Sequence, residues 1–228
     1  MSIKPWNELP QNMKNQSVKD YYEQLSKKRF SLILKRLFDL FASLCLLVLL
    51  SPVFVVLAIW IKLDSKGPVF YRQERITQYG RVFRIFKFRT MVSNADQIGS
   101  LVTVGNDSRI TKVGSKIRKC RLDEIPQLIN ILLGDMSFVG TRPEVKKYVD
   151  AYTDEMMATL LLPAGVTSLA SIHYKDEDEI LSSMVDENHS VDDVYIHKIL
   201  PEKMKYNLEY LKDFNIVKDI ILCIKTIL

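Results

Sequence analysis

The longest apolar run in the chain extends from Leu40 to Ile61 and contains no charged side chain. A helix of this run would be about 33 Å long at about 1.5 Å per residue, which is enough to cross the hydrocarbon core of a bilayer. Ser51 and Pro52 lie at its centre. Proline removes a backbone donor and clashes with the preceding turn, so the pattern predicts two helices with a break at Ser51-Pro52. The serine hydroxyl can bond a carbonyl that the break leaves free.

Basic residues flank this run on both sides: Lys27, Lys28, Arg29, Lys35 and Arg36 precede it, and Lys62, Lys66, Arg72, Arg75 and Arg81 follow it. An excess of Lys and Arg normally marks the cytoplasmic side of a membrane segment. Because both ends carry such an excess, the pattern favours a re-entrant hairpin with both ends on the same face. A straight crossing is the alternative. No small-residue cleavage site follows the run, which argues against a cleaved signal peptide.

The pattern of apolar and polar residues changes after Gly67. The stretch PVFYRQERITQYGRVFRIFKFRTM alternates apolar and basic residues around Gly80, which predicts short strands joined by a turn. Residues 110–119 mix aliphatic side chains with cations and predict a short amphipathic helix. Apolar residues at 125, 128, 129 and 132 have helical spacing, with Pro126 in the first turn and Gly134 at the end. The following stretch, MSFVGTRPE, is interpreted as a loop.

These elements predict an α+β protein, mainly helical, with four parts. Residues 1–28 form a polar surface leader, 29–66 the re-entrant membrane hairpin, 67–200 a small catalytic domain with short strands at the membrane interface, and 201–228 a C-terminal amphipathic helix. Such a helix can lie on a membrane surface or pack against its own domain. The acidic stretch 175–193 is interpreted as a solvated insert.

Composition narrows the class of partner. The chain has 228 residues and a formal net charge of +5, with a pI near 9.0. This favours an anionic partner, which could be nucleic acid, lipid headgroups or phosphorylated metabolites. The three cysteines are widely spaced, and neither they nor the three histidines show the spacing of a metal site. No disulfide framework is indicated, so a reduced, cytosol-facing protein is expected.

The candidate chemistry lies in CRLDEIPQL, where Asp123 and Glu124 directly follow a basic run. Acidic residues before a helix commonly cap its amide groups, and that is the simplest interpretation. Alternatively, nearby cations and amides keep one carboxylate ionised, and an ionised Asp can attack phosphorus. Its neighbour can bind Mg²⁺, which prefers carboxylate and phosphate oxygens. On chemistry alone, the pattern indicates phosphate chemistry beside a membrane.

An ordered set of motifs then becomes informative. The following motifs occur in this order, over about Lys35 to Ala170: KRLFDLFASL, LSP, IKLDSKGPVFYRQER, KFRTM, DSRIT, RKCRLDEIPQLINILLGDMSFVGTRPE and PAGVTSLAS. Together they resemble the bacterial sugar transferases, the small monotopic phosphoglycosyl transferases. The resemblance implies transfer of a phosphosugar from a UDP-sugar to undecaprenyl (polyprenol) phosphate, with release of UMP. It also implies a re-entrant helix broken at Ser-Pro and a place on the cytosolic face of the bacterial inner membrane.

The resemblance also assigns roles to residues. Asp123 would be the nucleophile that forms a covalent phosphosugar intermediate, Glu124 a Mg²⁺ ligand, and Arg118 a phosphate contact. Arg142, in the Arg-Pro element with Glu144, would bind the nucleotide diphosphate. Five further motif residues are expected to line the site, with scaffold hydrogen bonding as their alternative role: Lys87, Arg89, Asp107, Arg109 and Gln127.

The expected reaction is ping-pong, at the first membrane step of surface glycan assembly. Two alternatives stay open. In one, a carboxylate acts as a base while the lipid phosphate attacks directly in a ternary complex. In the other, the chain is a non-catalytic, membrane-anchored protein whose basic cluster binds anions. Nucleic acid is not an expected partner, a homodimer is left open, and the identity of the sugar cannot be predicted. Thr141 and Arg121 depart from the usual family pattern, which leaves the nucleotide and sugar contacts open.

Overall fold

The computed structural model describes residues 3–93, 95, 107–174, 177–184 and 190–227. The fold is mainly helical, with two small sheets of two short strands each among these residues, as predicted. Its helices are α1 (Gln16–Ser26), α2 (Arg29–Leu49), α3 (Ser51–Asp64), α4 (Lys112–Lys119), α5 (Gln127–Leu133), α6 (Lys146–Val149), α7 (Leu169–His173), α8 (Glu177–Met184), α9 (Val191–Val194), α10 (Leu200–Lys212) and α11 (Ile216–Ile227). Its strands are β1 (Phe70–Ile76), β2 (Val82–Phe88), β3 (Met136–Val139) and β4 (Ala164–Thr167).

The predicted break in the apolar run is confirmed. Helix α2 ends at Leu49, α3 begins at Ser51, and the two helices are bent by 60°. Pro52 cannot donate to the carbonyl of Val48 four residues earlier, and the Ser51 hydroxyl donates to that carbonyl instead, at 2.8 Å. No single helix in the described part of the chain is long and apolar enough to cross a membrane, whereas α2 and α3 together meet that test as a bent pair.

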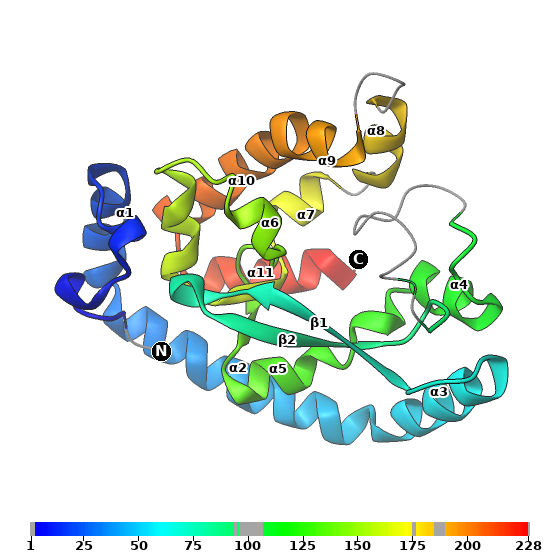
Figure 1. Ribbon diagram of the computed structural model, residues 1–228. Helices are drawn as coiled ribbons and strands as arrows, with labels where there is room; N and C mark the ends of the chain where they lie inside the picture. Colours follow the sequence, from blue (N-terminus) through cyan, green and yellow to red (C-terminus); the bar gives the residue numbers. More distant parts are fainter. Residues whose placement is uncertain (1–2, 94, 96–106, 175–176, 185–189, 228) are drawn as a thin grey trace.

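Helices α2 and α3 run along one edge of the molecule, with α5 and the β1–β2 hairpin beside them (Figure 1). Their inner side is buried against the domain at Leu32, Leu57 and Ile61. Their outer side carries a continuous series of exposed large apolar side chains: Phe30, Ile33, Leu34, Leu37, Phe41, Leu44, Val48, Leu49, Val55, Val56, Ile59, Trp60 and Leu63. An apolar surface of this extent is typical of a site that contacts a membrane or another protein.

The alternating stretch forms the antiparallel hairpin β1–β2, in which Phe70 pairs with Phe88 and Ile76 with Val82. Tyr79 and Gly80 form its turn with positive φ angles of 60° and 73°. Helices α4 and α5 also form as predicted. Gly134 ends α5 with a φ of 89°, a conformation that glycine adopts without strain.

The stretch MSFVGTRPE was predicted to be a loop, and its first part is not. Residues 136–139 form β3, which pairs in parallel with β4. Three of the four side chains in this strand are buried, so it lacks the alternation by which a short strand is recognised. The chain then crosses β4 very closely, since a Cβ at Gly165 would lie 2.2 Å from the Gly140 amide nitrogen. This crossing places Arg142 and Glu144 beside the hairpin.

Both ends of the described chain differ from the prediction. Val18, Tyr21 and Leu25 of α1 are buried in the main core, so this part of residues 1–28 is packed rather than a surface leader. The predicted C-terminal helix is two helices, α10 and α11, separated at residues 213–215. Helix α11 packs against its own domain at α2, β3 and β4. These contacts depend on residues far apart in sequence, which local periodicity does not reveal.

Candidate active site

One pocket of about 1090 Å³ brings together five parts of the chain. Its walls come from the β1–β2 hairpin, described residues between β2 and α4, the end of α4 with the turn that follows it, the loop after β3, and the segment from α7 to α10. Eight predicted site residues line it: Lys87, Arg89, Arg109, Arg118, Asp123, Glu124, Arg142 and Glu144. Motif residues that are dispersed along the sequence therefore meet around one cavity.

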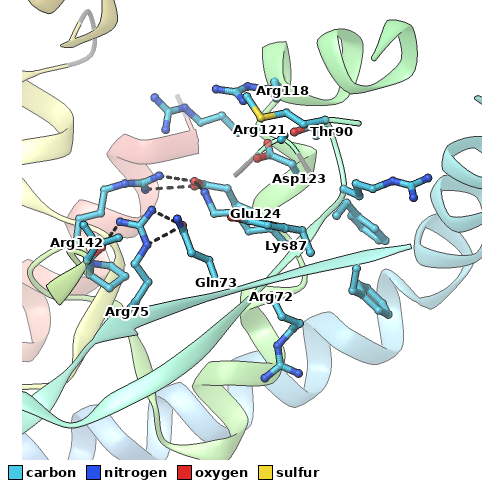
Figure 2. Close-up of a pocket in the computed structure, with 18 of the residues that line it drawn as sticks. Arg72, Gln73, Arg75, Lys87, Thr90, Arg118, Arg121, Asp123, Glu124 and Arg142 are labelled. Carbon is cyan, nitrogen blue, oxygen red and sulfur yellow. Dashed lines mark hydrogen bonds and ion pairs between the residues drawn. The ribbon is translucent and has the colours of Figure 1, made fainter. Parts of the chain in front are cut away.

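Asp123 and Glu124 lie in a tight 3₁₀ turn, Leu122–Glu124, between α4 and α5. Arg121 enters this turn in the left-handed conformation, with a φ of 51°. Helix α5 begins only at Gln127, and no side chain caps its N-terminus. Helix capping, the simplest interpretation of the acid pair, is therefore wrong. The turn instead presents both carboxylates to the pocket (Figure 2).

Glu124 is held between two cations. Both terminal nitrogens of the Arg142 guanidinium donate to its two carboxylate oxygens, and Lys87 Nζ donates from β2 at 3.1 Å. Burial alone would raise the pKa of Glu124, but the charges and hydrogen bonds of Arg142 and Lys87 outweigh burial and hold the pKa below its usual range. Glu124 is thus the carboxylate that neighbouring cations keep ionised.

Asp123 has a different environment. Its side chain is half-buried and lines the pocket, and no donor in the described part of the chain hydrogen-bonds to its carboxylate. Burial raises its pKa, Glu124 adds to the rise, and the charges of Lys87, Arg118 and Arg142 oppose it. The prediction that nearby cations keep one carboxylate of the pair ionised therefore holds for Glu124, whereas the pKa of Asp123, the expected nucleophile, is raised. A carboxylate with unoccupied oxygens and a raised pKa is a more basic group than an ordinary aspartate.

Cations converge on this carboxylate from both sides. Arg118, half-buried on α4, lies beside Asp123, and Arg142 and Lys87 lie on the side of Glu124 (Figure 2). Arg75 of β1 donates to the side chain of Gln73 at 2.6 Å and to the carbonyl of Pro143 at 3.2 Å. An array of guanidinium and ammonium groups around two carboxylates suits a ligand that carries phosphate groups.

Arg75 and Gln73 were not predicted as site residues. A signal for them exists in the strand period, because residues 71, 73 and 75 alternate along β1 and Tyr71 pairs with Lys87 on β2. Figure 2 shows Gln73 and Arg75 on the side of Arg142, whereas Arg72 points away. Because Tyr71 pairs with Lys87, residues 71, 73 and 75 share the face of Lys87, so the pairing register would have identified Gln73 and Arg75 as site residues. The sequence alone does not give that register.

Two predicted residues, Arg89 and Asp107, have mainly scaffold contacts, and a third, Gln127, has a buried side chain with no hydrogen-bond partner in the described part of the chain. Arg89 is buried and donates to the carbonyls of Ser65 and Lys66 at 2.7 and 2.9 Å, so it closes the end of α3. Asp107 forms an ion pair with Arg109 at 2.6 Å and does not line the pocket. Gln127 is 1% exposed and is also absent from the lining. The alternative weighed for these residues, scaffold hydrogen bonding, describes Arg89 and Asp107.

The donor set limits what metal the site could hold. In the described parts of the chain, no three or more His, Cys, Asp or Glu side chains are grouped to hold a metal ion. Mg²⁺ is commonly bound by one or two carboxylates together with substrate phosphates. Asp123 and Glu124 supply two adjacent carboxylates in the pocket. Both Glu124 oxygens already accept from Arg142, and one also accepts from Lys87, whereas no donor among the described residues hydrogen-bonds to the Asp123 oxygens. The residues therefore fit Mg²⁺ as a partner of a phosphate ligand, not as a preformed metal cage.

This chain belongs to the bacterial sugar transferase family, whose model matches residues 30–228. It is 34% identical over 197 residues to the Aeromonas hydrophila UDP-N-acetylgalactosamine-undecaprenyl-phosphate N-acetylgalactosaminephosphotransferase. The matched region covers 85% of this chain and 43% of that protein. It is 33% identical over 196 residues to a Klebsiella pneumoniae UDP-glucose:undecaprenyl-phosphate glucose-1-phosphate transferase, covering 83% and 38% of the two chains. A Bacillus subtilis sugar transferase without an assigned activity is 39% identical over 142 residues, covering 62% of this chain and 69% of that protein.

The chain thus spans less than half the length of the first two relatives. The family resemblance inferred from the ordered motifs is confirmed.

Proposed function

We propose that this protein transfers a phosphosugar from a UDP-sugar to undecaprenyl phosphate, giving a polyprenyl-diphosphate sugar and UMP. The names of the Aeromonas and Klebsiella relatives support the donor and acceptor classes. The observation that carries the proposal is the pocket itself. It places the carboxylate of Asp123, to which no described residue donates a hydrogen bond, beside Glu124, Lys87, Arg118 and Arg142.

The proposed reaction has two steps. In the first, an Asp123 oxygen bonds to the sugar-bearing phosphorus, and the bond from that phosphorus to the bridging oxygen breaks, so UMP leaves with the oxygen. In the second, an oxygen of the lipid phosphate bonds to the same phosphorus, and the acyl-phosphate bond breaks, which restores the Asp123 carboxylate. Each step exchanges one phosphorus–oxygen bond for another and needs no net proton transfer.

The surrounding residues supply electrostatic stabilisation in both steps. Lys87, Arg118 and Arg142 face charge that spreads over the phosphate oxygens, in a half-buried site where such contacts are stronger than in water. Asp123 and Glu124 are the residues that would hold Mg²⁺, which would neutralise part of the diphosphate charge when bound. Because Arg142 and Lys87 fix Glu124 from two sides, its carboxylate is already oriented before a ligand arrives.

The bent pair α2–α3 supports a location on one face of a membrane. Its outer side is apolar, and both its helices contact the same domain, α2 through α5 and α3 through α4. A re-entrant segment with both ends on the cytosolic face of the inner membrane would hold the pocket near the lipid headgroups. The soluble UDP-sugar and the membrane-bound acceptor would then meet there, at a step of surface glycan assembly.

The test is UMP release by purified protein in detergent with Mg²⁺ and a panel of UDP-sugars, first without and then with a short polyprenyl phosphate. We expect up to one equivalent of UMP without acceptor, together with an intact-mass increase of one phosphosugar. Asp123→Asn should abolish both signals. Asp154→Asn, an identical change at an exposed position, is the matched control and should retain them.

Other results would contradict the proposal in distinguishable ways. UMP release only in the presence of acceptor, with no adduct, would favour direct transfer in a ternary complex. Near-normal turnover by Asp123→Asn would show that Asp123 is not the nucleophile. No UMP from any donor, with retained anion binding by Asp123→Asn, would favour the non-catalytic alternative.

A further inference from the structure

A second group of residues, three charged and one a tyrosine, lines the pocket and has no role in the proposed phosphoryl transfer. Glu144, Glu177, Tyr195 and Lys203 come from the loop after β3, from α8, from the π-helical turn Tyr195–Ile199 and from α10. We name these four residues the Lys203 cluster. Lys203 Nζ donates to the Tyr195 hydroxyl at 2.9 Å and to Glu177 at 3.0 Å, and Tyr195 donates to Glu144.

The members of the Lys203 cluster differ in how far they are open to the pocket. The side chains of Lys203 and Glu144 are only 5% and 7% exposed, whereas that of Glu177 is 26% exposed. Lys203 is the one side chain in the described parts of the chain that donates to the Glu177 carboxylate. Since a carboxylate offers about four acceptor positions, Glu177 retains capacity to accept further hydrogen bonds from a ligand.

The Lys203 cluster carries a net negative charge of its own, opposite in sign to the excess of cations around Asp123 and Glu124. The cluster itself has two carboxylates for one ammonium group, with the guanidinium groups of Arg75 and Arg142 at its border. A phosphate would be repelled by the two carboxylates of the cluster. A hydroxyl group would be attracted, because it can donate to a carboxylate without adding negative charge. The Lys203 cluster therefore suits an uncharged, hydroxyl-bearing ring.

Its position also suits the donor. Glu144 is two residues from Arg142, and the charge of Glu177 acts on the Arg142 guanidinium that holds Glu124. A molecule that places its diphosphate at Arg142 would carry a sugar ring on one side and a ribose on the other. Both rings bear hydroxyl groups, and either could reach the wall next to Arg142.

We propose that Glu177 is a specificity-determining residue that accepts a hydrogen bond from a ring hydroxyl of the nucleotide-sugar donor, held in place by Lys203. The inference rests on the proposed function. Glu177 lies in the acidic stretch 175–193, which the sequence indicated to be a solvated insert. Part of that stretch instead contributes to the pocket wall.

The test compares kcat/KM for UMP release between an intact UDP-sugar and analogues that lack one hydroxyl. One arm removes each hydroxyl of the transferred sugar in turn, and the other uses the 2′-deoxyribose and 3′-deoxyribose forms of the donor. In the wild type, loss of the contacted hydroxyl should lower kcat/KM about 10-fold or more. In Glu177→Ala the same pair of donors should differ by no more than about twofold.

Two further variants keep this test interpretable. Glu177→Gln keeps an acceptor for Lys203 and should show an intermediate preference, even if the alanine variant folds poorly. Glu209→Gln makes the same charge change at an exposed position of α10 outside the pocket and should keep the full wild-type preference. The arm that shows the effect identifies the ring as sugar or ribose.

The possible failures are distinct. If the wild type releases UMP, but Glu177→Ala and Glu177→Gln discriminate among all analogues as the wild type does, the role of Glu177 is wrong and the proposed function stands. If the wild type releases UMP from none of the donors, both proposals are wrong.

Discussion

A buried ion pair connects the apolar helix α2 to the C-terminal helix α11, and its removal gives a quantitative prediction. Lys35 Nζ contacts Asp219 at 2.5 Å and also donates to the carbonyl of Val139 at 2.8 Å. The other Asp219 oxygen accepts from the Tyr210 hydroxyl at 2.9 Å. Neither charged side chain is more than 2% exposed. Lys35→Met removes the ammonium group while keeping most of the side-chain volume.

The expected cost follows from burial. Removing one partner of a buried pair leaves an unpaired charge and costs about 3–5 kcal/mol. For a chain of this size, about 1 kcal/mol corresponds to a change of about 2–4 °C in melting temperature, so Lys35→Met should lower it by roughly 6–20 °C. Adding Asp219→Leu removes the orphaned charge and should recover part of the loss. Recovery should be incomplete, because Tyr210 and Val139 each lose a hydrogen-bond partner and the buried carboxylate of Asp39 still lacks the Lys35 charge; an unpaired buried polar group costs about 1–3 kcal/mol.

The measurement is thermal unfolding followed by circular dichroism, with all variants in the same detergent. Lys27→Met removes a lysine at an exposed position and should stay near the wild-type melting temperature, since surface changes usually cost less than about 0.5 kcal/mol. A melting temperature for Lys35→Met equal to that of the Lys27 control would refute the reasoning. So would a double variant that is less stable than Lys35→Met alone.

Two further predictions concern the site and its frame. In the proposed reaction Asp123 attacks as a carboxylate, so kcat/KM should fall as the pH drops through the pKa of Asp123. The Lys87 charge lowers that pKa, so Lys87→Gln should move the acidic limb of the pH–rate profile to higher pH. A limb that stays in place or moves to lower pH would contradict this prediction. Gly67 has a φ of +131°, and a Cβ there would lie 1.9 Å from Arg89 Nη1. Gly67→Ala should therefore lower the free energy of unfolding, measured by chemical denaturation, by about 1–3 kcal/mol. A decrease smaller than the error of the measurement would show that the chain after α3 adapts freely.

The elements that local patterns predicted share a physical basis. The break near Pro52 follows from a missing amide, the β1–β2 hairpin from alternation around Gly80, and α5 from apolar residues at helical spacing before Gly134. Each depends on residues within a few positions of one another. Strand β3 and the separation of α10 from α11 were missed because they are stabilised by distant partners, namely β4 and the core.

For the site, the same division applies. The acid pair and Arg142 were predicted from motif residues, but their different environments were not, because Glu124 is held by Lys87 and Arg142 from segments 37 and 18 residues away. Arg75 required the strand register. Glu177 was missed because an acidic stretch is normally solvated, and only the contact with Lys203 places it in the pocket wall.

By itself, the sequence determined the class of the chain, the broken apolar segment and the acid pair, since each is written in neighbouring residues or in an ordered set of motifs. The tertiary structure alone decided which carboxylate is neutralised by cations, which accepts no hydrogen bond from the residues that the structure describes, and which charges line the remainder of the pocket. The physical reason is that electrostatic and hydrogen-bonding environments depend on distance in space. Chain crossings such as that of Gly140 over Gly165 bring together groups whose separation in sequence carries no record of their contact.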